Sequence, residues 1–174
     1  MGRMVIREID PGSAGEIALV AERMRATLVE VLGEERAVAM YSIDWLVDRV
    51  RHHLDPARST GAVFVACAER EIVGHSIVRV ENDGGGASYG LFSTTYVAPE
   101  HRRSGVATAL LERGEQWMRE RALPLAATAT SQANAKLIGL YEKHGYTIVL
   151  RAGEMLRLEK RLEDGPEKKR AERS

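Results

Sequence analysis

The chain has 174 residues, enough for one domain with a sizeable buried core. Lysine plus arginine and aspartate plus glutamate number 25 each, so the formal net charge is zero, and aromatic residues make up 5% of the chain. Proteins that bind nucleic acid carry a basic excess and stacking aromatics, so this composition argues against nucleic acid as the partner.

The first half of the chain predicts one strand, two helices and a hairpin. Asp10-Pro11-Gly12 is a turn signal, and Ser13 can cap a helix whose apolar residues recur at helical spacing until Gly33. The expected elements are a strand over 5–9, a helix from Ser13 to Gly33, a helix from Ser42 to Asp55, and hairpin strands over 62–68 and 72–80.

The second half alternates strands and helices and ends in two β-like pieces. The expected elements are a strand over 89–97, a helix over 105–122, a strand over 125–130, a helix over 133–144, and strands over 146–151 and 154–161. The order β-α-α-β-β-β-α-β-α-β-β predicts a single mixed α/β (α+β) domain over residues 1–162 with a largely antiparallel central region. Residues 163–174 are charged and apolar-poor, which predicts a disordered tail.

One cysteine, Cys67, lies in the apolar run AVFVACA and is expected to be a buried hydrophobe rather than a nucleophile. A single cysteine allows no internal disulfide, which fits a reducing, cytoplasmic environment. The first residues contain no apolar signal region and no stretch reaches the length of a membrane span, so we expect no membrane association.

The segment from 94 to 118 carries the main functional signal. A β-type run stops at Pro99, a turn with arginines and glycine follows, and an amphipathic helix begins at once. Such a junction leaves N–H groups of residues 103–108 free to bind phosphate, and Arg102 and Arg103 would add charge-assisted contacts. The GK[ST] string of a Walker loop is absent, and the structural alternative is a solvated helix start with surface arginines.

Two motifs resemble those of the GNAT superfamily of acyl-CoA N-acyltransferases. The cofactor pattern of that family, Arg or Gln, two residues, Gly, one residue, Gly or Ala, is met by Arg102, Gly105 and Ala107. Its second signature, an Asn followed by a Tyr and then by a Gly-aromatic pair, is met by Asn134, Tyr141 and Gly145-Tyr146. The order of the predicted elements also agrees with the family over residues 3–161.

The resemblance implies a GNAT-like fold, acetyl-CoA as acyl donor, and direct transfer of the acetyl group to a primary amine in a ternary complex. It implies that Tyr141 lies near the cofactor sulfur and protonates the leaving thiolate, and that Asn134 contacts the pantetheine arm besides capping its helix. On spacing alone, Tyr141 could equally be a core residue beside Leu137 and Leu140. The residues expected to bind the cofactor are Tyr96, Val97, Arg102, Arg103, Ser104, Gly105, Val106, Ala107, Thr108, Asn134 and Tyr141.

The strand before the loop is expected to act through its backbone. We expect the N–H of Val97 to stabilise the developing oxyanion, and the edge around Tyr96 and Val97 to bind the pantetheine amides. Residues 89–97 contain no carboxylate or histidine, so the general base is open: Glu81 and His75 on the preceding strand are candidates, as is a water held by Ser93 or Thr95. No metal-ligand spacing is present, and we expect no metal.

The sequence does not identify the acyl acceptor. Tyr41 and Trp45 could line its pocket, and a small-molecule amine, a peptide N-terminus or a lysine all stay open, as does a homodimer. The missing strand carboxylate supports a second hypothesis, a catalytically inactive acyl-CoA-binding regulatory or interaction module. Gly139 lies inside a predicted helix, where glycine costs about 1 kcal/mol relative to alanine, and it is expected to permit close packing.

Overall fold

The computed structural model describes residues 4–162, and its centre is a mixed sheet of seven strands. The strand order is β1-β2-β3-β4-β5-β7-β6, with β4 and β5 parallel and every other neighbouring pair antiparallel. The strands are β1 (Met4–Glu8), β2 (Gly61–Ala68), β3 (Glu71–Asn82), β4 (Ser88–Val97), β5 (Leu125–Ser131), β6 (Thr147–Ala152) and β7 (Met155–Arg161).

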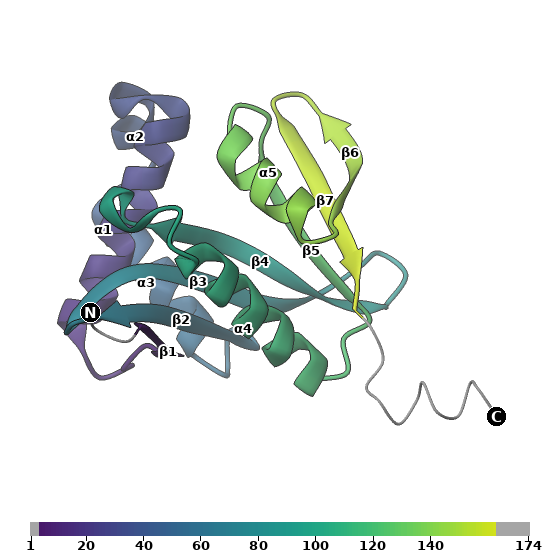
Figure 1. Cartoon of the computed structure of the whole chain (residues 1–174), viewed down its shortest axis with the longest axis horizontal. Coiled ribbons are helices and arrows are strands. Elements are labelled where there is room, and N and C mark those ends of the chain that lie inside the picture. Colours follow the sequence, from purple (N-terminus) through teal and green to yellow (C-terminus); the bar gives the residue numbers. More distant parts are fainter. Residues whose placement is uncertain (1–3, 163–174) are drawn as a thin grey trace.

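Helices cover both faces of this sheet (Figure 1). The helices α1 and α3 pack on one face against Val63, Val65 and Ile77, whereas α4 and α5 pack on the other. The helices are α1 (Ala14–Leu32), α2 (Glu34–Met40), α3 (Ile43–Leu54), α4 (Val106–Glu120) and α5 (Ala135–Lys143), with a 3₁₀ turn η1 (Pro99–His101) before α4.

The mixed α/β architecture and the order of the predicted elements are confirmed, with one helix added. Sequence analysis ended the first helix at Gly33 and left residues 34–41 unassigned, whereas the structure has α2 there. Gly33 has a positive φ of 87°, so it ends α1 and, one residue later, a new helix begins in a different direction. The predicted tail at 163–174 lies outside the described residues.

Side-chain caps set the helix starts that the sequence predicted. The Ser13 side chain accepts a hydrogen bond from the N–H of Glu16, and Ser42 does the same for Trp45. The Asn134 side chain accepts from Leu137 at the start of α5. Each cap satisfies an N–H group that the helix itself leaves without a partner.

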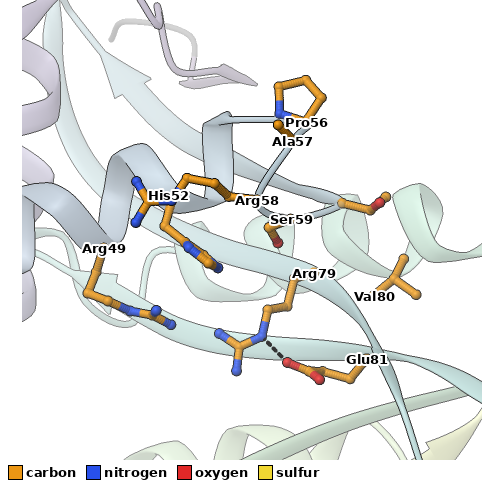
Figure 2. Close-up of a pocket in the computed structure, with 10 residues that line it drawn as sticks. Arg49, His52, Pro56, Ala57, Arg58, Ser59, Arg79, Val80 and Glu81 are labelled. Atoms are coloured by element: carbon orange, nitrogen blue, oxygen red, sulfur yellow. Dashed lines mark hydrogen bonds and ion pairs between the residues drawn. The ribbon is translucent and has the colours of Figure 1, made fainter.

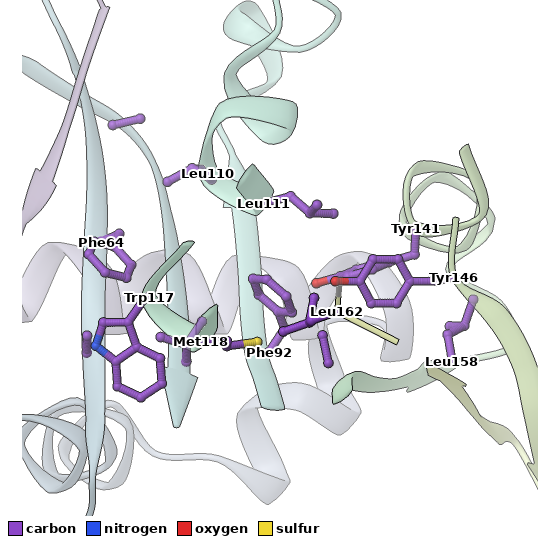
Figure 3. Packing of buried hydrophobic residues seen from close by; sticks show 14 of the residues in the cluster. Phe64, Phe92, Leu110, Leu111, Trp117, Met118, Tyr141, Tyr146, Leu158 and Leu162 are labelled. Carbon is purple, nitrogen blue, oxygen red and sulfur yellow. The ribbon is translucent and has the colours of Figure 1, made fainter. Parts of the chain in front are cut away.

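The core on the α4 side depends on close approach between α4 and the sheet (Figure 3). An added Cβ on Gly114 would lie 2.3 Å from Phe92 Cε1, so glycine at this position lets the helix lie directly on β4. Phe92 in turn meets the ring of Tyr141 edge-on, with centroids 5.7 Å apart. This packing fixes the distance of α4 and α5 from the strand that carries the candidate site.

The sheet separates between β4 and β5. These strands pair only where Gly90–Phe92 meet Ala126–Thr128, after which they diverge (Figure 1). At the same point Ser93 has no partner on β3, because Phe92 lies opposite Val78 and Thr94 lies opposite Ile77. This bulge bends β4 away from β5 and leaves residues 93–97 without a partner strand on that side within the described residues.

Candidate functional site

The open edge of β4 carries the first part of the site. Ala98 donates its N–H to the carbonyl of Val73, and Val97 lies opposite Gly74. In an antiparallel ladder hydrogen-bonded and non-hydrogen-bonded pairs alternate. The N–H and C=O groups of Thr95 and Val97 therefore point away from β3, toward the gap between β4 and β5.

The same alternation separates Tyr96 from its two neighbours. Its backbone groups point toward His75 on β3, so its N–H is not free on the open edge. The Tyr96 ring stacks on the His75 ring at 5.8 Å between centroids, and the Arg23 guanidinium lies 5.4 Å from the Tyr96 ring centre. Tyr96 thus packs toward α1, and the N–H groups that face the gap belong to Thr95 and Val97.

Tyr141 reaches this edge from α5. Its hydroxyl lies 3.3 Å from the Thr95 hydroxyl, and its ring is 1% exposed between Phe92 and Tyr146. Burial raises the pKa of Tyr141 to about 12, against a smaller lowering by the hydroxyls of Thr95 and Thr128. The side chain is therefore a protonated donor at neutral pH, and it is also the core residue that spacing suggested as the alternative.

The loop from Arg102 to Gly105 carries α4 back to the end of β4. Arg103 and Gly105 have positive φ values of 65° and 86°, and Gly105 forms the start of α4 without a side-chain cap. The Ser104 hydroxyl donates to the carbonyl of His101. The first N–H groups of α4, those of Val106, Ala107 and Thr108, have no acceptor in residues 4–162.

The surroundings of this helix start suit an anion. A Cβ built on Gly105 meets nothing within 4 Å, so the approach to these N–H groups is open. The Val106 side chain is buried at 4% exposure, which fixes the first turn of α4 against the core while its backbone faces the loop. N–H groups at a positive helix end without a competing cap are a phosphate-binding arrangement.

Arg102 differs from the expected phosphate contact in the direction of its side chain. Its Nε donates to the carbonyl oxygen of Val97 at 2.9 Å, and its Nη2 pairs with Glu30 of α1 at 2.9 Å. The arginine of the cofactor motif thus ties the loop to the end of β4 and to α1. Arg103, by contrast, is exposed and has no ion pair within the described chain.

His75 lies near the site without facing it. The ring is fully buried, its Nε2 lies 3.1 Å from Thr94 Oγ1, and its Nδ1 has no partner among the described atoms. Burial, reinforced by the charge of Arg23, lowers the pKa of His75 to about 3. The imidazole is neutral at physiological pH, and it packs on the α1 side of the sheet beside Tyr96.

The structure does not bring Glu81 to Tyr141. Ser76 lies opposite Thr95, and Glu81 is five positions further along β3, which is roughly 17 Å at the usual strand rise. Its carboxylate forms an ion pair with Arg79 on the face that α3 covers (Figure 2). Strand direction and side-chain alternation together separate this candidate base from the gap.

Tyr41 and Trp45 lie together at the junction of α2 and α3. Their ring centroids are 5.4 Å apart, Trp45 is 48% exposed, and the Arg49 guanidinium lies 5.8 Å from its ring centre. Within residues 4–162, no hydrogen bond, ion pair or ring contact joins either of them to Tyr141 or to the loop before α4. Cys67 is half-buried on β2 against the α1 side of the core, also apart from Tyr141.

Two residues that sequence reasoning did not select take part in this arrangement. Glu30 of α1 holds Arg102, and Thr128 donates to the carbonyl of Phe92 at 3.0 Å where β4 and β5 separate. Both are contacts between distant segments, so no spacing in the sequence signals them. Within residues 4–162, no cluster of His, Cys, Asp or Glu is arranged to hold a metal ion, and no helix has the length and apolarity to cross a membrane.

Comparison with protein families gives a match over most of the chain. Residues 23–146 match the model of the acetyltransferase (GNAT) family. A curated relative, acetyl transferase GW6a of Oryza sativa subsp. japonica, is 41% identical over 51 residues, which are 29% of this chain and 12% of that protein. The aligned part of the chain thus spans about an eighth of that relative.

Solved structures share the fold at low sequence identity. The PaiA N-acetyltransferase of Thermoplasma acidophilum, solved with coenzyme A, superposes with a TM-score of 0.74 at 16% identity, covering 91% of this chain and 99% of that one. The NatC complex bound to Gag peptide and CoA gives a TM-score of 0.73 at 17% identity, covering 92% and 99%. At this identity the likeness concerns the architecture.

Proposed function

The chain belongs to the acetyltransferase (GNAT) family, and from that premise we propose that it transfers an acetyl group from acetyl-CoA to a primary amine. Transfer is direct, within a ternary complex of both substrates. The observation that carries the proposal is the meeting of the Tyr141 hydroxyl with the unpaired edge of β4, 3.3 Å from Thr95 Oγ1. Cys67 lies on another strand, which argues against a covalent acyl-enzyme.

The N-terminal turn of α4 would hold the diphosphate of the donor. The N–H groups of residues 103–108 would supply donors that need no side-chain ordering, and those of Val106, Ala107 and Thr108 have no acceptor in the described chain. Arg103 is free to add charge, whereas Arg102 supports the loop from behind through Val97. The N–H and C=O groups of Thr95, which face the gap, would bind the pantetheine amides as an added strand does, because the C=O of Val97 already accepts from Arg102. Asn134 would contact the same arm from the start of α5.

The chemistry divides between a backbone donor and a side-chain donor. The N–H of Val97 would stabilise the oxyanion of the tetrahedral intermediate, an interaction worth roughly 3–4 kcal/mol at such sites. Tyr141 would donate its proton to the departing sulfur. Its raised pKa keeps the phenol protonated over the whole working range of pH, so the proton is present when the thiolate departs.

Proton removal from the amine is assigned to water rather than to a side chain. His75 is neutral but buried behind Tyr96, and Glu81 is held by Arg79 at the other end of β3. A water hydrogen-bonded to the Thr95 hydroxyl or to Ser93 at the bulge would accept the proton at the open edge. The acceptor itself is a small-molecule amine or the amino group of a peptide.

The decisive experiment is an acceptor screen with acetyl-CoA and detection of free thiol, followed by mass spectrometry of the product. We expect thiol release that depends on an amine and a product heavier by one acetyl group. A calorimetric titration with CoA runs in parallel. Binding of CoA without turnover on any amine, peptide or polyamine would indicate an acyl-CoA-binding module instead of an enzyme. Absence of CoA binding would overturn both hypotheses.

A further inference from the structure

A polar cavity, separate from the candidate site, lies between the end of α3 and strand β3 (Figure 2). It is open to solvent and has a volume of about 550 Å³. Its position along β3 is that of Glu81, which pairs with Tyr89 near the start of β4, whereas the candidate acetyl-transfer site lies at the opposite end of that strand. The residues that line it and carry the argument are Arg49, Arg58, Ser59, Thr60, Arg79 and Glu81.

Three guanidinium groups reach this cavity from three different elements. Arg49 comes from α3, Arg58 from the loop after it, and Arg79 from β3. Arg58 pairs with the exposed Asp48, and Arg79 pairs with Glu81. Arg49 has no ion pair within residues 4–162, and its contact is the face of Trp45. Glu81 also lines the cavity, so three guanidinium groups and the carboxylates of Asp48 and Glu81 leave a net charge of +1.

The hydrogen bonds of His53 fix how Arg79 is held. His53 Nδ1 lies 2.7 Å from the carbonyl of Arg49, so Nδ1 carries the proton and Nε2 is the acceptor for Arg79 Nη1 at 3.0 Å. Burial lowers the pKa of His53 to about 4, so this imidazole stays neutral and does not add to the cationic charge. Arg79 keeps its Nη2 group without an acceptor in the described chain.

The end of α3 is held rigidly beside these groups. A Cβ added to Gly61 would lie 2.8 Å from the carbonyl oxygen of Val78 and 3.2 Å from that of His53, so β2 begins in direct contact with both β3 and the end of α3. The hydroxyls of Ser59 and Thr60 line the same cavity and make no hydrogen bond within residues 4–162. They are free donors at a preorganised cationic site.

We propose that this cavity binds a phosphate group, held by Arg49, Arg58 and Arg79 with the hydroxyls of Ser59 and Thr60. Guanidinium forks match the oxygens of a phosphate in pairs, and the hydroxyls of Ser59 and Thr60 offer further donors, which the several oxygens of a phosphate can accept from and the two oxygens of a carboxylate use less fully. The group comes either from inorganic phosphate or from a small phosphomonoester, and the volume of the cavity admits both. The site is independent of the acetyl-CoA site.

The test is a titration of the full chain with inorganic phosphate and, separately, with glycerol 3-phosphate, followed by amide NMR shifts. Saturating CoA is present throughout so that the α4 helix start is occupied. We expect shifts at Ser59, Thr60 and Arg79, and at least tenfold weaker binding in Arg49→Gln. Arg58→Gln, at an exposed position, serves as a second variant and should weaken binding in the same direction.

Arg51→Gln is the matched control, because Arg51 is exposed on the same helix and does not line the cavity. It changes the net charge by the same amount, so it should alter affinity less than twofold. Equal weakening in Arg49→Gln and Arg51→Gln would reduce the effect to general surface charge and overturn the proposal. Shifts confined to residues 103–108, or no binding of either probe, would overturn it as well. Tighter binding of glycerol 3-phosphate than of phosphate would identify a phosphomonoester as the ligand.

Discussion

Arg102 donates from Nε to the carbonyl oxygen of Val97 at 2.9 Å, so the arginine of the cofactor loop is bonded to the strand whose N–H groups face the reaction site. The same guanidinium pairs with Glu30, which connects α1 to that loop. Loop, strand end and first helix are thereby held by one side chain. The two adjacent arginines therefore differ in role: Arg102 positions the loop, and Arg103 faces solvent.

Arg102→Ala is expected to raise the KM for acetyl-CoA about tenfold, because a hydrogen bond from a charged group is worth roughly 1.5–3 kcal/mol and tenfold corresponds to about 1.4 kcal/mol. Steady-state kinetics and calorimetry with CoA measure the change. Glu30→Gln removes the exposed ion pair alone and should have a much smaller effect. Equal KM values for Arg102→Ala and the unmodified protein would show that the loop does not need this anchor.

Tyr141→Phe is expected to lower kcat by about 10²-fold with little change in CoA affinity, since the substitution removes a proton donor and keeps the buried ring. Turnover at saturating substrates is the measurement. Tyr146→Phe is the control: Tyr146 lies against Tyr141, but its hydroxyl donates to Glu115 at 2.8 Å. That variant should lose stability and keep kcat within a fewfold. Unchanged turnover in Tyr141→Phe would remove the phenol from the mechanism.

The pH dependence of kcat/KM should follow the pKa of the acceptor amine rather than the pKa of a side chain of the enzyme. The pKa of His75 is about 3 and that of Tyr141 about 12, so neither side chain titrates between pH 5 and 9. With water as the proton acceptor, the rate rises with pH until the amine is neutral. Two acceptors of different amine pKa should give rising limbs displaced by that difference. A limb at one fixed pH for both acceptors would indicate a protein base.

The free energy of unfolding should fall as the pH falls from about 6.5 toward 5. The folded pKa values of His53 and His75 are about 4 and about 3, below the usual 6.5, so the unfolded chain binds protons that the native state does not. Their contribution is present above pH 6.5 and is lost as the pH drops toward the folded values, by about 1–2 kcal/mol per histidine at pH 5. Urea unfolding at several pH values measures it, and His75→Gln should flatten the slope. A slope unchanged by that substitution would contradict the assignment.

Two helical glycines should respond to alanine in opposite ways. Gly139 was expected to allow close packing, but a Cβ there meets nothing within 4 Å, so that interpretation is wrong. Gly139→Ala should stabilise α5 by about 0.5–1 kcal/mol. Gly114→Ala should destabilise by about 1–3 kcal/mol, because its Cβ would collide with Phe92. Denaturant midpoints of the two variants provide the comparison, and a shift of the same sign in both would refute it.

The sequence by itself determined the element order apart from α2, the capping serines and the two motifs around Gly105 and Tyr141, because these depend on local spacing and backbone preference. It also indicated that β4 lacks a carboxylate. Tertiary structure alone decided that Glu81 lies apart from Tyr141, that Tyr96 faces His75 while Thr95 and Val97 face the gap, and that Arg102 binds Val97 and Glu30. The reason is physical. Ladder alternation, the bulge at Ser93 and the contacts between distant segments depend on the register in which the strands pair, and the spacing of residues along the sequence does not specify that register.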